Sequence, residues 1–317
     1  MKILITGGFG YLGGRLAKDL ASRGGHEIVL GSRLQVKPPS WLPHVKVVQT
    51  RWNSQTDLEN MCGGLDVVIH LAGMNAHDCA LNPTEALEIN GVNTARFLQS
   101  AIQKKVKRFI YVSTAHVYRN PLVGTITEET CTTNVHPYAT SHRAGEDVVR
   151  FAHQRGEIEG IVIRLSNAFG APLSPETNCW MLLVNDLCRQ AVTSQRMVLQ
   201  SSGLQRRDFV PLTDACRATE HLLELSSEKL GNGLFNVGGA WTPRVIDIAE
   251  TIQTRCSEVL RFRPNIIRPK PHDGEITMDL DFRIDKLLAS GFALFGNTAA
   301  EIDATLLLCR ESFGGDQ

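Results

Sequence analysis

The sequence has no long apolar run and no excess of charge of either sign. None of its apolar runs approaches the roughly 20 residues that a membrane-spanning helix requires. Lys and Arg together number 33, as do Asp and Glu, so the formal net charge is +0 and no overall field attracts nucleic acid or an anionic membrane. The first predicted strand begins at Lys2, which leaves no room for a signal peptide. We therefore expect a cytoplasmic protein that binds neither nucleic acid nor membrane.

Cysteine patterns that would indicate a metal site or a disulfide framework are also missing. Eight cysteines occur in 317 residues, but none forms a Cys-x-x-Cys pair and no Cys/His group has zinc-ligand spacing. We interpret them as reduced and mostly buried thiols and expect no metal. A hydrophobic content of 43% and a charged content of 21% are ordinary for a soluble globular enzyme. The length allows one large domain or two closely joined ones.

Short apolar runs alternate with helix-like stretches through the first half of the chain. The predicted strands lie at 3–5, 27–30, 45–48, 66–70, 109–112 and 161–163, and the predicted helices at 12–23, 84–104 and 138–154. Continuous apolar runs separated by helices are typical of parallel strands that are buried on both faces. The pattern predicts an α/β fold with a doubly wound parallel sheet and a ligand at the carboxyl ends of the strands.

After about Leu165 the pattern changes, because prolines interrupt the chain and loops lengthen. Further short strands are predicted at 209–211 and 234–237. We predict a dinucleotide-binding domain over 1–165, to which part of 208–240 returns. The rest, 166–317, is predicted to be mainly a smaller substrate-binding lobe.

Three glycines indicate a phosphate-binding turn between the first strand and the first helix. Gly7, Gly10 and Gly13 occur in Thr-Gly-Gly-Phe-Gly-Tyr-Leu-Gly, directly after a strand and at the start of a helix. Gly7 permits a tight turn, Gly10 lets the backbone approach a pyrophosphate, and Gly13 lets the helix pack closely on the strand. The amides and the dipole of the helix N-terminus favour the negative phosphate charge. The segment predicts dinucleotide binding, with a purely structural turn as the alternative.

Together with Tyr138 and His142, spaced four residues apart, this glycine segment resembles the extended short-chain dehydrogenase/reductase family. That family contains nucleotide-sugar epimerases, dehydratases and ketoreductases, and its residue four after the tyrosine is nearly always lysine. The resemblance covers nearly the whole chain, is most specific at 6–13 and Tyr138, and fades after Asn236. It implies a Rossmann-type sheet with a smaller C-terminal lobe and an NAD(P) cofactor.

The end of the second strand bears on the choice of dinucleotide. Where the resemblance places an acidic residue that bonds the ribose hydroxyls, the sequence has Gly31, followed by Ser32 and Arg33. Ser and Arg suit a 2′-phosphate, which a carboxylate would repel. We therefore expect NADP, with NAD as the alternative. If NAD is the cofactor, Arg33 would only stack on the adenine or face solvent.

The resemblance implies further cofactor-binding positions. In addition to the glycines, Ser32 and Arg33, the implied positions are Tyr11, Leu12, Asn53, Leu71, Ala72, Gly73, Asn90 and Leu165. Asn53 is a loose match to a position near the adenine, and Leu165 would offer its backbone to the nicotinamide carboxamide. Asn90 would steady the helix and strand under the cofactor, or else be a buried residue at a helix bend.

The resemblance also implies three catalytic residues. Tyr138 is the acid or base, Thr114 positions the substrate oxygen, with Ser113 as the alternative hydroxyl, and His142 holds the nicotinamide ribose. Four residues along a helix bring Tyr138 and His142 to one face. A histidine is only partly charged near neutral pH, so it lowers the pKa of the phenol less than a lysine does.

Three outcomes are open for His142. It replaces lysine with slower or pH-shifted turnover, another cation such as Arg143 supplies the charge, or the site binds without catalysis.

Substrate-binding residues are implied on the other side of the site. Asn167 and Arg207 match family positions that contact the diphosphate of a nucleotide-linked sugar, and Arg268 is a poorer match for the same task. A surface ion pair is the alternative for Arg207. His116 lies near the expected sugar as a second proton donor or a structural residue. Ala115 and His116 replace the acid and base of the family's 4,6-dehydratases, which argues against that reaction.

These residues predict an NAD(P)-dependent oxidoreductase that reduces a keto group of a nucleotide-linked sugar, with Tyr138 as the proton donor. The alternatives are a nucleotide-sugar epimerase that retains its cofactor and a non-catalytic dinucleotide-binding sensor. By analogy with the family we expect a homodimer.

Overall fold

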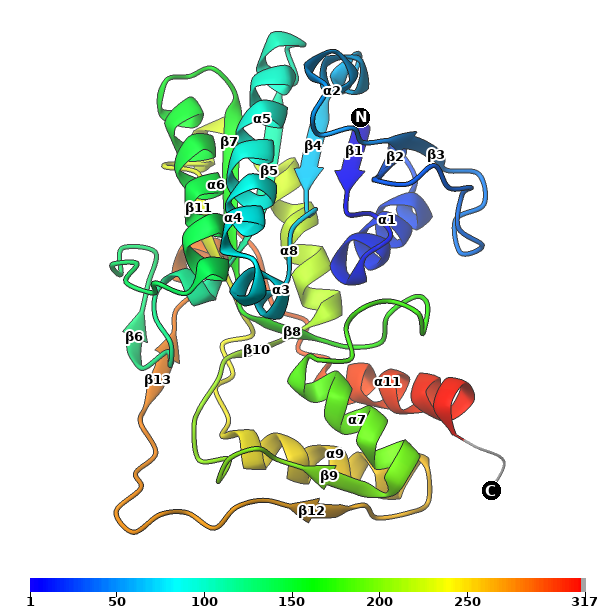
Figure 1. Ribbon diagram of the computed structural model, residues 1–317, viewed down its shortest axis with the longest axis vertical. Coiled ribbons are helices and arrows are strands. Elements are labelled where there is room, and N and C mark those ends of the chain that lie inside the picture. The colour runs from blue at the N-terminus through cyan, green and yellow to red at the C-terminus, as the bar shows by residue number, and fades with distance from the viewer. Residues whose placement is uncertain (315–317) are drawn as a thin grey trace.

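The computed structural model describes residues 1–314 and is organised around a seven-stranded parallel sheet with the order β11-β7-β5-β4-β1-β2-β3 (Figure 1). Its strands are β1 (Lys2–Thr6), β2 (Glu27–Ser32), β3 (Lys46–Gln49), β4 (Val67–His70), β5 (Arg108–Thr114), β7 (Glu159–Leu165) and β11 (Leu234–Val237). All six pairs of neighbouring strands are parallel. The prediction of a Rossmann-type parallel sheet is therefore confirmed.

Burial of both faces of the sheet explains why its strands are continuously apolar. All four residues of β4 and the last four of β1 are buried, as expected for strands covered by helices on both sides. Helices α1 (Tyr11–Arg23) and α8 (Leu212–Glu224) pack together on one face, and α5 (Asn93–Gln103) and α6 (Pro137–Gln154) lie on the other (Figure 1). The strand order reverses between β1 and β4, which places a ligand crevice at their carboxyl ends.

The helix predicted over 84–104 is divided into three parts. Helix α4 (Pro83–Ala86) leads into a π-helical turn (Leu87–Val92), and α5 continues from Asn93. Within the turn, Gly91 brings the chain against α6, because a Cβ at this position would lie 3.2 Å from the Cβ of Ala144. The π-turn also directs Asn90 toward Met74 and Ser141. Single π-turns of this kind occur frequently at functional sites.

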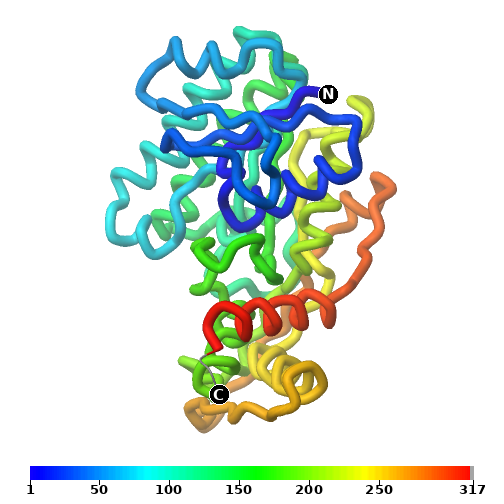
Figure 2. Tube along the Cα trace, turned by 90° about the vertical axis from the view of Figure 1, so that its right-hand side faces the viewer, coloured from blue at the N-terminus to red at the C-terminus, as the bar shows by residue number. Residues whose placement is uncertain are grey.

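The second half of the chain adds a separate group of helices below the sheet (Figure 2). Helices α7 (Leu183–Ser194), α9 (Val245–Val259) and α11 (Thr298–Phe313) share a second apolar cluster. Three further parallel pairs, distinct from the main sheet, join β8 (Asn167–Phe169) to β10 (Phe209–Pro211), β9 (Arg196–Val198) to β12 (Asn265–Ile267), and β6 (Gly124–Ile126) to β13 (Leu280–Phe282). The remaining helices are α2 (Gln55–Cys62), α3 (Ala76–Leu81), α10 (Asp285–Ala289) and two 3₁₀ turns (Ala115–Val117 and Ser227–Lys229). The division into domains at residue 165 stays a prediction.

Two features are absent from residues 1–314. None of the helices there is both long and apolar enough to cross a membrane. The same residues contain no group of three or more metal-ligating side chains.

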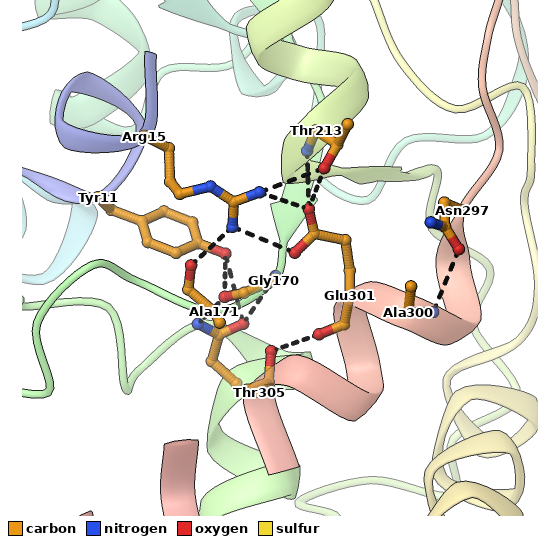
Figure 3. A network of polar contacts seen from close by, with 10 residues as sticks. Tyr11, Arg15, Gly170, Ala171, Thr213, Asn297, Ala300, Glu301 and Thr305 are labelled. Carbon is orange, nitrogen blue, oxygen red and sulfur yellow. Dashed lines mark hydrogen bonds and ion pairs between the residues drawn. The ribbon is translucent and has the colours of Figure 1, made fainter. Parts of the chain in front are cut away.

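A buried ion pair ties the glycine-rich helix to the last helix of the chain (Figure 3). Arg15 of α1 lies 2.8 Å from a carboxylate oxygen of Glu301 on α11, and it also donates to the carbonyl of Ala171 at 2.9 Å. The Glu301 carboxylate accepts from the backbone N–H and the hydroxyl of Thr213. The side chains of Arg15 and Glu301 are only 17% and 5% exposed. The network therefore fixes α1 relative to the helices below the sheet.

We predict that Glu301→Gln lowers the free energy of unfolding by about 2–4 kcal/mol, because it leaves the buried Arg15 charge without its counter-ion. Denaturant titration followed by circular dichroism measures this change. Arg96→Gln is the control, since it removes a pair with Glu88 in which both side chains are more than 40% exposed, and it should change little. Equal stability of the Glu301→Gln variant and the unchanged protein would contradict the prediction.

Candidate active site

The glycine-rich turn brings backbone atoms closer together than any side chain permits. Gly7 has a φ of +69°, and its carbonyl accepts from the N–H of Gly10 at 2.8 Å. A Cβ on Gly13 would lie 2.3 Å from the carbonyl oxygen of Gly7, and a Cβ on Gly7 would lie 2.9 Å from the carbonyl carbon of Leu71. The turn can therefore be made only with glycines, and it leaves the first amides of α1 open to an anionic ligand.

A cavity of about 360 Å³ opens at the carboxyl ends of the strands. It brings together thirteen of the site residues predicted from the sequence, which are Gly7, Gly10, Tyr11, Leu12, Gly13, Leu71, Gly73, Thr114, His116, Tyr138, His142, Leu165 and Asn167. Met74, Asn75, Leu182 and Leu183 also line it, and the sequence carried no signal for these four. Segments more than 100 residues apart thus meet in one crevice, as expected at a switch point.

Seven predicted site residues lie outside this cavity. Ser32 ends β2 and is half-buried, whereas Arg33 and Asn53 are exposed nearby. The Ser32 hydroxyl accepts from the N–H of Leu34 at 3.2 Å. The predicted roles of these three residues in cofactor binding stay predictions.

Ala72 and Asn90 do not line the cavity, but both form hydrogen bonds with neighbouring segments. The N–H of Ala72 donates to the Thr6 hydroxyl at 3.4 Å. The buried Asn90 accepts from the N–H of Met74 at 2.9 Å and donates to Ser141 at 3.0 Å. Asn90 therefore joins the loop after β4 to helix α6, and its predicted role under the cofactor stays a prediction.

The two arginines predicted to bind the substrate, Arg207 and Arg268, lie in loops of the second half of the chain and do not line the cavity. Arg207 is close enough to His116 for its charge to lower the pKa of that imidazole. Within residues 1–314 its guanidinium forms no ion pair, so the surface ion pair considered for it is not present. Arg268 donates to the carbonyl of Ser202 and is exposed.

Tyr138 is held near the start of α6 with its proton in place. Burial raises the pKa of Tyr138, and a hydrogen bond with Thr114 acts in the opposite direction with a smaller effect. The ring of His116 stands edge-on to Tyr138, with the two centroids 6.4 Å apart. Burial and the Arg207 charge lower the pKa of His116. Tyr138 is therefore a phenol and His116 a neutral imidazole at neutral pH.

His142 lies one turn along α6, and its ring is perpendicular to that of Tyr138 at a centroid distance of 4.7 Å. The side chain is only 7% exposed, and burial lowers the pKa of His142 to about 4. Its Nδ1 lies 2.9 Å from the hydroxyl oxygen of Tyr111 on β5. The sequence analysis missed Tyr111, although a phenol within a buried strand requires a partner for its hydroxyl.

The cavity is free of formal charge. Among the described residues that line it, none is Asp, Glu, Lys or Arg, and both of its histidines have lowered pKa values. Arg143, considered as a substitute cation, instead donates to the Thr132 carbonyl and lies 3.9 Å from Asp147 on the exposed face of α6. The described lining of the cavity therefore offers backbone amides and neutral side-chain donors, and no formal charge.

A buried ion pair behind the site was also missed. Glu146, fully buried on α6, lies 2.6 Å from Arg164 on β7 and accepts from the Ser113 hydroxyl at 2.5 Å. This bond engages Ser113, which leaves Thr114 as the hydroxyl beside Tyr138. The spacing of Glu146, eight residues after Tyr138 and thus about two turns along the same helix, is a signal that could have identified this position.

Residues 3–238 match the model of the family described as "NAD dependent epimerase/dehydratase family". The chain belongs to the NAD-dependent epimerase/dehydratase family. The resemblance to the extended short-chain dehydrogenase/reductases is thereby confirmed.

Curated relatives of this family member are similar over most of their length. A dTDP-glucose 4,6-dehydratase from Streptomyces niveus is 24% identical over 295 residues, which cover 88% of this chain and 84% of that protein. UDP-glucuronic acid decarboxylase 6 from Arabidopsis thaliana is 26% identical over 324 residues, with 90% and 89% covered.

Solved structures of sugar epimerases share the fold. A UDP-glucose 4-epimerase from Thermotoga maritima, solved with UDP-glucose, has a TM-score of 0.83 at 19% identity and covers 98% of this chain and 99% of its own. A UDP-glucuronic acid 4-epimerase from Bacillus cereus, solved with NAD, has a TM-score of 0.81 at 20% identity, with 100% and 99% covered. At these identities the likeness shows a shared fold.

We predict that Gly13→Ala weakens dinucleotide binding by at least about tenfold, because the new methyl group would push Gly7 out of the turn. Gly14→Ala is the matched control, since its Cβ would meet its nearest atoms at 3.6 Å, an ordinary contact. Dissociation constants for NADH and NADPH, measured by fluorescence titration, test the pair. Equal affinities of the two variants would contradict the role assigned to the close approach.

Proposed function

We propose that the protein transfers hydride between NAD(P) and a ring carbon of a nucleotide-diphosphate sugar, and that it acts as an epimerase. The observation that carries this proposal is the meeting of Thr114, Tyr138 and His142 with the glycine-rich turn in one cavity. The similarity to sugar epimerases supports the epimerase assignment. The cofactor fits the residues present, because the glycine turn forms a cradle that a side chain would fill.

Tyr138 moves the proton in this scheme. In the oxidising step its phenolate takes the proton of a sugar hydroxyl while the attached carbon gives up a hydride, and in the reducing step the phenol returns the proton. The Thr114 hydroxyl orients the sugar oxygen beside Tyr138. A bound nicotinamide supplies or accepts the hydride. An epimerase needs both directions, with the ketone presented by its opposite face in the second step.

The other residues bind and position. Gly7, Gly10 and Gly13 offer the amides of α1 to the pyrophosphate of the cofactor, and His142 bonds the nicotinamide ribose. On the substrate side, Asn167 and Arg207 bind the diphosphate of the sugar nucleotide, where a guanidinium matches phosphate geometry. His116 contacts the sugar as a neutral donor or acceptor.

NADP remains our proposed cofactor, with NAD as the alternative. No carboxylate stands at the end of β2, where a Cβ on Gly31 would lie 3.1 Å from a methyl group of Thr50. The sequence has no acidic side chain at this position, and any side chain there would crowd Thr50. The exposed Arg33 and the hydroxyl of Ser32 are available to a 2′-phosphate.

Reduction of a sugar ketone is the second candidate function, and the protonation state of Tyr138 favours it. Because burial raises the pKa of Tyr138, the phenol that donates a proton to a ketone is the resting form. The phenolate that an oxidising step needs is scarce at neutral pH unless the bound cofactor stabilises it.

Cofactor stoichiometry separates the two functions. The purified protein is incubated with NADPH or NADH and a panel of UDP- and dTDP-linked sugars and 4-keto sugars, while cofactor absorbance and sugar products are followed together. An epimerase interconverts sugars without net oxidation, whereas a reductase consumes one reduced cofactor per sugar. Tyr138→Phe should lower either rate by about 10²–10⁴-fold and leave cofactor binding intact. Full activity of this variant would contradict the proposal, and cofactor binding without turnover of any sugar would favour a non-catalytic sensor.

The pH profile of His142→Lys tests how the absence of a lysine charge beside Tyr138 limits the rate of proton removal. Oxidation of a sugar hydroxyl requires the Tyr138 phenolate, so its rate rises with pH toward the pKa of Tyr138. A lysine ammonium beside the phenol lowers that pKa. We therefore expect the rate of His142→Lys to rise at a pH that is lower by about one unit or more. Initial rates of sugar interconversion, or of cofactor reduction if the cofactor is released, measure the shift from pH 6 to 10. Loss of activity with intact cofactor binding would show that histidine has a role that lysine cannot fill.

We further propose a homodimer that pairs α5 and α6 with their counterparts. Exposed apolar side chains on and near these helices include Leu87, Val92 and Phe151, the last 61% exposed, and such surfaces often mark interfaces. Sedimentation should give a dimer for the unchanged protein and a monomer for Phe151→Lys. A monomer in both cases would contradict the proposal.

A further inference from the structure

The imidazole of His142 is fixed from behind by a buried phenol. Tyr111, 1% exposed on β5, places its hydroxyl oxygen 2.9 Å from Nδ1 of His142. The same hydroxyl lies 3.4 Å from the carbonyl oxygen of Asn90. Since a phenol has one proton to donate, only one of these two contacts can receive it.

The surrounding hydrogen bonds decide where that proton goes. The Thr94 hydroxyl donates to the Asn90 carbonyl at 2.7 Å. Behind Thr94 lies His70, whose Nε2 contacts the Thr94 oxygen at 3.1 Å and whose Nδ1 contacts the Thr6 hydroxyl at 2.6 Å. Because Thr94 uses its proton on Asn90, its oxygen accepts from Nε2–H of His70, and Nδ1 of this neutral ring then accepts from the Thr6 hydroxyl. The Thr6 oxygen accepts in turn from the N–H of Ala72.

The Asn90 carbonyl, which also accepts from Thr94, is the weaker of the two acceptors for the Tyr111 proton, because 3.4 Å is longer than an ordinary O–H···O bond. The Tyr111 proton is left for Nδ1 of His142, at the shorter of its two contacts. An imidazole that accepts at Nδ1 and is neutral carries its own proton on Nε2.

We propose that Tyr111 is a positioning residue, which holds His142 in the Nε2–H tautomer so that a neutral N–H donor faces the cofactor side of the cavity. A Cβ added at Gly73 would lie 3.7 Å from Nε2 and 3.5 Å from Cε1 of the His142 ring. Glycine at this position therefore leaves the edge of the imidazole accessible. His142 then supplies the donor that a ribose hydroxyl accepts, without supplying charge to Tyr138. The part of this inference that concerns the cofactor rests on the proposed function.

The tautomer is measured in the cofactor-free protein by ¹⁵N NMR of the histidine rings near neutral pH. The chain has ten histidines, and the resonances of His142 are those that His142→Gln removes. We expect a protonated Nε2 and an unprotonated Nδ1. A proton on Nδ1, or an imidazolium, would overturn the inference, and this measurement needs no substituted Tyr111.

Tyr111→Phe removes the hydroxyl and keeps the shape of the side chain. We expect a mixture of His142 tautomers and about three- to tenfold weaker NAD(P)H binding, the effect of one hydrogen bond. Tyr118→Phe is the matched control, because it removes another buried phenol hydroxyl, bonded to Asn236 at 2.7 Å, from a side chain that does not contact His142. It should leave the tautomer unchanged.

An unchanged tautomer and an unchanged affinity in Tyr111→Phe would overturn the inference. Both readouts are independent of any sugar. If the tautomer is as expected but no nucleotide sugar is turned over, the proposed function fails while the positioning role stands. If sugars are turned over and His142 carries its proton on Nδ1, the positioning role of Tyr111 fails while the proposed function stands.

Discussion

The burial of His142 without a counter-ion determines the chemistry of the site. Taking an imidazolium out of water is costly unless a carboxylate is nearby, and the group in contact with this ring is the phenol of Tyr111. The ring is therefore neutral, and the Thr114 hydroxyl stabilises a Tyr138 phenolate less than burial disfavours it. Proton donation by Tyr138 is consequently easier than proton removal, and any positive charge that assists the reverse step has to come with a bound cofactor.

The rest of the cavity follows the same principle. Its lining provides backbone amides, hydroxyls and neutral rings, while the ion pairs stand behind it. Glu146 and Arg164 lie under the sheet ends, and Arg15 and Glu301 hold the glycine-rich helix against α11 (Figure 3). Charges in these places rigidify the walls without perturbing the groups that move protons. A charged ligand such as a diphosphate then meets oriented dipoles that need no rearrangement.

The sequence predicted the parts of the fold that local rules determine. The seven strands, the glycine turn and the helices that begin at Tyr11 and Pro137 follow from apolar runs, glycines and helix signals within a few residues of one another. The π-turn at Leu87–Val92 was not predictable, because it depends on the close approach of Gly91 to α6. The helices α7, α9 and α11 were also missed, since prolines and long loops concealed their periodicity.

The candidate site was predicted to a similar extent and for similar reasons. Residues of the glycine turn and of the Tyr138 helix lie together as expected. The contacts that set their protonation involve Tyr111 and Thr94, which have no motif of their own and reach the site only through the packing of β5 and α5 against α6. A pKa depends on such three-dimensional neighbours, so the sequence identified His142 as unusual but left its charge open.

The most direct test of this account is an ultraviolet titration of tyrosine ionisation in the cofactor-free protein, with Tyr138→Phe as the reference. The chain has four tyrosines, and burial raises the pKa of each of them. The account predicts no phenolate signal between pH 6 and 9, with the Tyr138 contribution appearing only above about pH 10. A phenolate that forms near neutral pH and disappears in Tyr138→Phe would contradict it.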